Sequence, residues 1–79
     1  MVLKIFLSTT LRKYVPDYDP AKGLETDISK GTTVADLCRQ SNIPINEVKI
    51  IMVDGTKREK EHVLSGGERV YLFPPVGGG

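Results

Sequence analysis

The residues with the clearest chemical potential stand at the carboxyl end, which reads RVYLFPPVGGG over residues 69–79. Gly77, Gly78 and Gly79 carry no side chain, so they form a thread of backbone thickness that passes where any side chain would clash. The reactive group on such a thread is the α-carboxylate of Gly79. A carboxylate anion is a poor electrophile and needs activation, usually as an acyl-adenylate made with ATP. We therefore predict chemistry at Gly79 that depends on a nucleotide-binding partner.

The rest of the chain offers no site for that nucleotide. The pair Gly66-Gly67 lacks the Lys-Ser/Thr of a phosphate-binding loop and precedes a predicted strand instead of a helix. Pro74 and Pro75 cannot donate ladder hydrogen bonds and favour an extended path, so they end the last strand and direct the tail outward. Residues 74–79, at about 3.3 Å each, reach roughly 20 Å, enough to enter another protein's active site. The pattern indicates that the chemistry at Gly79 takes place in the active site of a partner.

Other reactive side chains predict little chemistry. Cys38 is the one cysteine, which excludes a disulfide framework and a zinc cluster. It falls on the apolar stripe of a predicted helix, where a buried, inert thiol is expected. We expect no metal site and no bound cofactor. With no disulfide framework, we expect the protein to be cytoplasmic.

The composition limits the kinds of partner that this protein is expected to bind. Eleven basic and ten acidic side chains leave a net charge of +1, which gives no field that would favour nucleic acid or an anionic membrane. No apolar run approaches the roughly 18 residues of a membrane span. A length of 79 residues with 39% hydrophobic and 27% charged residues is typical of one small globular domain. We place that domain at residues 1–73 and a tail at residues 74–79.

Two strands are predicted in the first third of the chain. Residues 2–7 alternate in hydrophobicity and predict a strand. Residues 8–23 contain two prolines and a glycine, which indicates a loop or an irregular connection. Residues 24–28 alternate again and predict an edge strand that pairs antiparallel with the first.

Helical spacing follows in GTTVADLCRQSNIP. From Val34 onward the apolar residues recur at i, i+3 and i+4, which predicts one helix of two to three turns. Thr33 is the expected N-cap, and Asp36 completes a capping box while complementing the helix dipole. Asn42 fits a left-handed C-terminal cap.

Three strand segments end the domain. Residues 48–53 are apolar on both faces, which favours a central position in a sheet. Asp54-Gly55 predicts a hairpin turn, followed by a short charged return segment at residues 56–64. Residues 69–73 predict the last strand. The order strand, strand, helix, strand, short strand, strand predicts an α+β roll, in which a mixed four- to five-stranded sheet wraps over one main helix.

The last strand presents two different faces. Val70 and Leu72 are expected in the core, which leaves Tyr71 and Phe73 on the opposite face together with Phe6. Several aromatic side chains on one face of a small protein indicate a docking surface. The predicted partner-docking residues are Phe6, Tyr71, Phe73, Pro74, Pro75 and Val76.

The segment GGERVYLFPPVGGG resembles the carboxyl end of the ubiquitin-like sulfur carriers (MoaD/ThiS-like), above all the small subunit of molybdopterin synthase. That family typically ends on G-D-x-V-x-x-F-P-P-V-x-G-G. Gly67 matches the turn glycine, residues 73–76 the pre-tail motif, and Gly78-Gly79 the terminal pair, whereas Gly77 replaces a position that often holds a small side chain. LRKY, TTVADL and MVDGT lie where the family has similar elements. The resemblance covers essentially the whole chain and implies the β-grasp fold of ubiquitin.

The resemblance also implies a mechanism in which this chain is a carrier or co-substrate, not an enzyme, and the catalytic machinery lies in its partners. An adenylating enzyme of the ubiquitin-activating type would activate the Gly79 carboxylate with Mg-ATP, and a sulfur donor would displace AMP to leave a thiocarboxylate. Gly77 and Gly78 would thread into each partner. The sulfur would pass to a pterin precursor inside the large synthase subunit, in molybdenum cofactor biosynthesis.

Other functions stay open for the same tail. The sulfur acceptor could be the thiamin thiazole, a cysteine precursor or transfer RNA. A protein modifier in the ubiquitin manner would instead join Gly79 to a lysine. A β-grasp binding module with an inert tail is the third class, because glycine-rich termini are commonly frayed ends.

Overall fold

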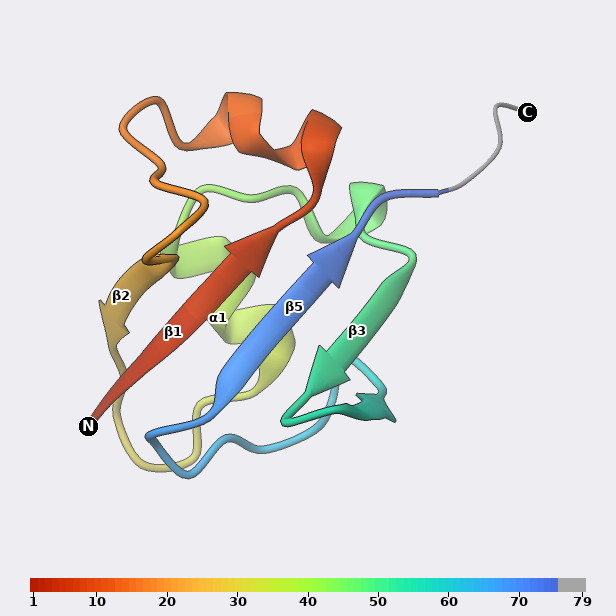
Figure 1. The fold of residues 1–79 in the computed structure, drawn as a ribbon. Helices are drawn as coiled ribbons and strands as arrows, with labels where there is room; N and C mark the ends of the chain where they lie inside the picture. Colours follow the sequence, from red (N-terminus) through yellow and green to blue (C-terminus); the bar gives the residue numbers. More distant parts are fainter. Residues whose placement is uncertain (76–79) are drawn as a thin grey trace.

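A five-stranded mixed sheet frames the protein, seen in a computed structural model that describes residues 1–75 apart from the side chain of Thr9. The strands are β1 (Val2–Leu7), β2 (Leu24–Asp27), β3 (Ile50–Val53), β4 (Thr56–Arg58) and β5 (Arg69–Phe73). The helices are α1 (Val34–Gln40) and two 3₁₀-helices, η1 (Thr9–Tyr14) and η2 (Ile45–Glu47). The order across the sheet is β2-β1-β5-β3-β4, with β1 and β5 parallel and the other neighbours antiparallel (Figure 1). The predicted α+β roll is confirmed.

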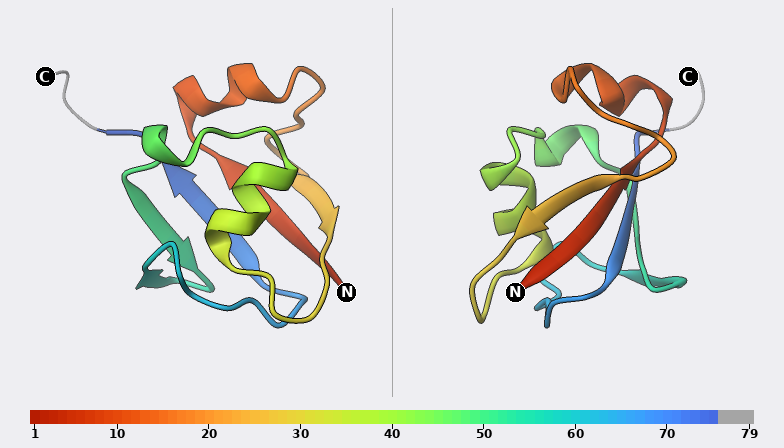
Figure 2. Two further views of the ribbon diagram at one scale, coloured as in Figure 1. Left: turned by 180° about the vertical axis from the view of Figure 1, so that it is seen from behind. Right: turned by 60° about the vertical axis from the view of Figure 1, so that its left-hand side comes forward.

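The core lies between one face of the sheet and α1, which lies in front of the sheet in the left view of Figure 2. Alternate residues of β1 and β5 point into this layer because successive side chains of a strand face opposite ways. The apolar stripe of α1 meets them, and its three members are fully buried. The side chains that make up the core are Leu3, Ile5, Leu7, Leu11, Ile28, Val34, Leu37, Cys38, Ile43, Ile51, Val53, Leu64, Val70 and Leu72.

Both ends of α1 carry the predicted caps. The Thr33 hydroxyl accepts a hydrogen bond from the Asp36 N–H at 3.1 Å, and the Asp36 carboxylate accepts one from the Thr33 N–H at 3.2 Å. These bonds satisfy two amide donors at the helix start, and the bond from the Thr33 backbone lowers the pKa of Asp36. Asn42 takes the left-handed conformation, with φ of 61°. A seven-residue helix is therefore bounded on both sides by local signals.

The β3–β4 hairpin follows the predicted turn, with one difference at its start. Asp54 and Gly55 both have positive φ, 51° and 86°, as the turn requires. The strand predicted from residue 48 begins at Ile50, because residues 45–47 form η2 directly after Pro44. β3 is an interior strand between β5 and β4, but the middle of the sheet is β5.

Two other boundaries differ from the sequence prediction. The segment after β1, predicted as irregular, contains η1, which packs Leu11 into the core at the end of the sheet. β2 ends at Asp27, one residue early, and the buried Ile28 continues the core beyond it. Among the described residues, no helix has the length and apolar character to cross a membrane.

The capping box predicts a stability change that is specific to the hydroxyl of Thr33. Thr33→Ala should lower the free energy of unfolding by ~1 kcal/mol, because the Asp36 amide loses its acceptor. Thr33→Ser keeps the hydroxyl and should retain most of that free energy. Urea unfolding of the three proteins measures the difference. Equal losses in both variants would contradict the role assigned to the cap.

Candidate functional site

β5 positions the predicted docking residues, since it is the middle strand and its two faces differ in burial. Val70 and Leu72 are 0% exposed, packed in the core, as the alternation predicts. Tyr71 and Phe73 are half-buried on the other face of the sheet, which we call the outer face. The assignment of the faces from sequence is thus confirmed.

An aromatic pair holds the centre of the outer face. Register pairs Phe6 of β1 with Tyr71 of β5, and the two rings stack with centroids 4.8 Å apart and planes inclined by 16°. Pairs of this kind stabilise by roughly 0.5–1.5 kcal/mol beyond the area they bury. Both rings stay half-buried, so they present a preformed apolar surface.

Two residues of β3 extend this surface, and the sequence analysis missed both. Register places Met52 opposite Tyr71 and Ile50 opposite Phe73, and both are half-buried. The outer face therefore carries an apolar strip across three strands. The alternation of Ile50 and Met52 with the buried Ile51 and Val53 is the signal that could have found it.

η1 and the loop after it wall off one end of the outer face. A pocket of about 280 Å³ lies there, lined by both rings of the stack, Phe73, Arg12 and Tyr18, among others. The Tyr18 hydroxyl accepts from the Leu7 N–H at 2.8 Å, and Arg12 Nε donates to the Leu7 carbonyl at 3.0 Å. The Arg12 guanidinium also lies over the Tyr18 ring, 5.6 Å from its centre. These contacts fix the wall to the end of β1, and no sequence pattern had indicated them.

Gly23 allows the Phe6 ring to lie where it does. Its φ is +75°, and a Cβ at this position would lie 2.9 Å from the Phe6 ring and 3.0 Å from the Ile5 carbonyl oxygen. Such distances are too short for ordinary contact, so a side chain here would displace the ring. The aromatic stack therefore depends on a glycine in the neighbouring loop.

The chain leaves the sheet beside the apolar strip. The Phe73 carbonyl accepts a hydrogen bond from the Lys49 N–H at 2.8 Å. Pro74 and Pro75 follow outside the strand and have no N–H to donate to a ladder. Pro74 is half-buried and Pro75 is exposed, at the end of β5 that Figure 1 shows farthest from the amino terminus.

The remaining tail predictions fall beyond this point. Val76, Gly77, Gly78 and Gly79 lie outside the described residues, so threading and modification stay predictions. The division into a domain at residues 1–73 and a tail at residues 74–79 likewise stays a prediction.

Cys38 takes no part in the outer face. Its side chain is 0% exposed on α1, and burial raises the pKa of its thiol to about 11. A thiol held protonated at neutral pH is a poor nucleophile. No group of three or more His, Cys, Asp or Glu side chains in residues 1–75 is arranged to hold a metal ion.

The sheet is mixed, its first strand β1 and its last strand β5 pair in parallel, and it wraps over one main helix. This is the architecture of the ubiquitin-like β-grasp proteins. The family described as Mut7-C ubiquitin matches residues 2–77, and the chain belongs to this ubiquitin-like family. No curated protein matches the chain.

Solved structures of ubiquitin-like proteins share the fold. Small archaeal modifier protein 1 of Haloferax volcanii is 14% identical, with 95% of this chain and 98% of that one covered and a TM-score of 0.70. A putative molybdopterin converting factor, subunit 1, from Pyrococcus furiosus is 19% identical, with 96% and 99% covered and a TM-score of 0.71. The Haloferax volcanii HVO 2177 protein is 25% identical, with 100% and 87% covered and a TM-score of 0.74. The β-grasp prediction is confirmed, and the MoaD/ThiS-like resemblance is confirmed as membership of a ubiquitin-like family whose fold a putative molybdopterin converting factor subunit shares.

Gly23→Ala should destabilise the protein more than the same change at a glycine in open space. Gly55 is the matched control, because its φ is +86° but nothing lies within 4 Å of a Cβ built there. Gly55→Ala should cost about 1–2 kcal/mol of unfolding free energy through its backbone conformation alone. Gly23→Ala should cost about 1–3 kcal/mol more, because the Phe6 ring must move.

Urea unfolding and the near-ultraviolet circular dichroism of the tyrosines measure these effects. The dichroism of the Phe6–Tyr71 stack should change in Gly23→Ala only. Equal destabilisation by both substitutions would show that the ring does not depend on this glycine.

Proposed function

We propose that this protein is a sulfur carrier whose Gly79 carboxylate is converted to a thiocarboxylate for molybdopterin biosynthesis. The observation that carries the proposal is the end of β5. There the sheet stops at Phe73, two prolines follow, and the chain departs beside a preformed apolar strip. A partner that docks on the strip thus has the outgoing chain at the edge of its contact surface.

The chemistry divides between the carrier and its partners. An adenylating enzyme of the ubiquitin-activating type supplies Mg-ATP, and the Gly79 carboxylate attacks the α-phosphate with release of pyrophosphate. A sulfur donor then supplies hydrosulfide, which attacks the acyl carbon. A C–S bond forms, the C–O bond to AMP breaks, AMP leaves, and loss of a proton gives the thiocarboxylate. The large synthase subunit accepts the sulfur onto a pterin precursor. This chain contributes the docking face and the thread, and it acts as a co-substrate in the cytoplasm.

The outer face suits transient docking on more than one partner. Its rings are already ordered by stacking, so binding costs little additional side-chain entropy. Half-buried aromatic and methionine side chains supply apolar area to a partner while staying compatible with a free monomer.

A second candidate function is that of a protein modifier. The similarity in fold to small archaeal modifier protein 1 favours it, and the same adenylated tail would serve. Gly79 would then form an isopeptide bond with a lysine, which a blot of higher-mass conjugates detects. Sulfur transfer to the thiamin thiazole, a cysteine precursor or transfer RNA uses the carrier chemistry with a different acceptor, and a binding module with an inert tail uses none.

The sulfur carrier predicts a change in intact mass. Co-expression with a cognate adenylating enzyme and a sulfur donor should yield protein whose mass reflects one oxygen replaced by sulfur at Gly79. Deletion of Gly78 and Gly79 should leave unfolding by urea unchanged and abolish the mass shift. Failure to find the shift with every adenylating enzyme of the host would contradict the proposal, and lysine conjugates without the shift would favour the modifier.

Tyr71→Ala should weaken docking without blocking the chemistry of the tail. Loss of a central aromatic contact should raise the KM for this protein in ATP–pyrophosphate exchange about tenfold, ~1.4 kcal/mol, with kcat little changed. Tyr14→Ala is the matched control, since Tyr14 lies on η1 and bonds to Glu47 instead of joining the outer face. Equal KM values for the two variants would show that the apolar strip has no role in docking.

A further inference from the structure

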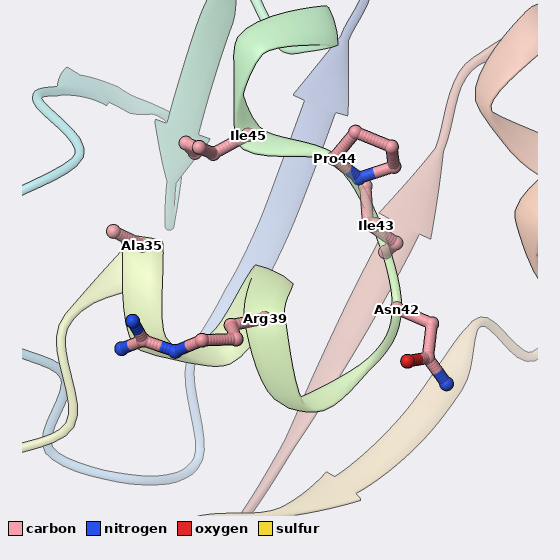
Figure 3. Close-up of a pocket in the computed structure, with 6 residues that line it drawn as sticks. All are labelled: Ala35, Arg39, Asn42, Ile43, Pro44 and Ile45. Atoms are coloured by element: carbon pink, nitrogen blue, oxygen red, sulfur yellow. The ribbon is translucent and has the colours of Figure 1, made fainter.

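Two adjoining pockets form a groove on the helix side of the protein. The first, of about 380 Å³, lies between α1 and residues 42–45, and Figure 3 shows the side chains that line it. The second, of about 400 Å³, lies between residues 45–51 and residues 57–61 of the β4 hairpin. Ile45 lines both pockets, so they lie next to each other. We call them together the helix-side groove.

The half of the groove next to α1 is apolar. Ile43, 2% exposed, lies at its base, and Ala35, Pro44 and Ile45 are half-buried around it. In Figure 3 the Ala35 methyl and the Ile45 side chain lie on the same side of the pocket, and Arg39 extends along its rim. This half has room for an apolar side chain of a ligand.

The other half of the groove is basic. Lys49, Lys57, Arg58 and Lys60 line it against two acidic neighbours, Glu59 and Glu61, and all six residues are exposed. None of the four basic side chains forms an ion pair with another described residue, whereas Arg39 of the apolar half is paired with Asp36. The four basic and two acidic side chains give this half a formal net charge of +2, whereas the whole chain carries only +1. Positive charge is therefore concentrated in this half of the groove.

We infer that the helix-side groove binds an extended acidic peptide segment of a protein partner, anchored by one apolar side chain. The anchor lies against Ile43, Pro44 and Ile45, and the carboxylates that follow it face the basic half. A nucleic acid fits less well, because the groove offers no aromatic side chain on which a base could stack. The inference goes beyond the proposed function, since the residues that line the groove are different from the residues of the apolar strip on the outer face.

Selection from a displayed library of random linear peptides, with the full chain as bait, tests this inference. Enriched peptides should carry several Asp or Glu residues next to a leucine, isoleucine or phenylalanine. Amide resonances of Ala35, Ile45 and Arg58 should shift when such a synthetic peptide is titrated, and the affinity should fall as salt is added. Peptides without acidic residues, shifts confined to Phe6 and Tyr71, or no enrichment would overturn the inference.

Charge reversal distinguishes specific binding in the groove from general attraction of an acidic peptide to a positive surface. R58E/K60E should weaken binding of the selected peptide about tenfold, ~1.4 kcal/mol. Arg58 is suitable because it pairs with the buried Ile51, so its side chain leaves β4 on the helix side. K13E/K22E is the matched control on exposed lysines outside the groove and should bind as the parent does. Equal weakening by both pairs would contradict a specific site.

An independent test of the apolar half of the groove uses Ala35. A35E places a carboxylate at the groove, and an acidic residue in the first turn of α1 is compatible with the helix. Binding should be lost while the circular dichroism of the fold is retained. Unchanged affinity would exclude this half of the groove as the anchor site.

Discussion

The position of β5 between β1 and β3 is the constraint on which the rest of the structure depends. Hydrogen bonding on both edges fixes the strand, and its alternation gives one face to the core and the other to the outside. Val70 and Leu72 therefore hold α1 against the sheet while Tyr71 and Phe73 build the apolar strip. The outgoing chain inherits its direction from the same strand, so core packing and the presentation of the tail are set together.

The two sides of the molecule offer different kinds of contact. On the outer face, stacked rings and their β3 neighbours make an apolar surface at the exit of the chain. On the helix side, an apolar pocket continues into a row of unpaired basic side chains. The partner proposed for the outer face and the peptide proposed for the groove would therefore contact different residues.

Much of the fold was predictable because its signals are local. The capping box of Thr33, the left-handed Asn42 and the Asp54-Gly55 turn each need only a few neighbouring residues. The strand order was not predictable from alternation alone, because it depends on pairing between strands distant in sequence. Alternation does separate Ile50 and Met52 from the buried Ile51 and Val53, but their places opposite Phe73 and Tyr71 come from the register with β5. The wall made by Arg12 and Tyr18 was missed for a different reason, because it rests on side chains that bond to the backbone of Leu7, and no sequence pattern indicates such bonds.

The parallel pairing of β1 with β5 has a consequence for folding. The two strands are far apart in the sequence, so a segment that stops short of β5 has no middle strand and no completed core. Closure over such a long separation is slow compared with forming a local hairpin.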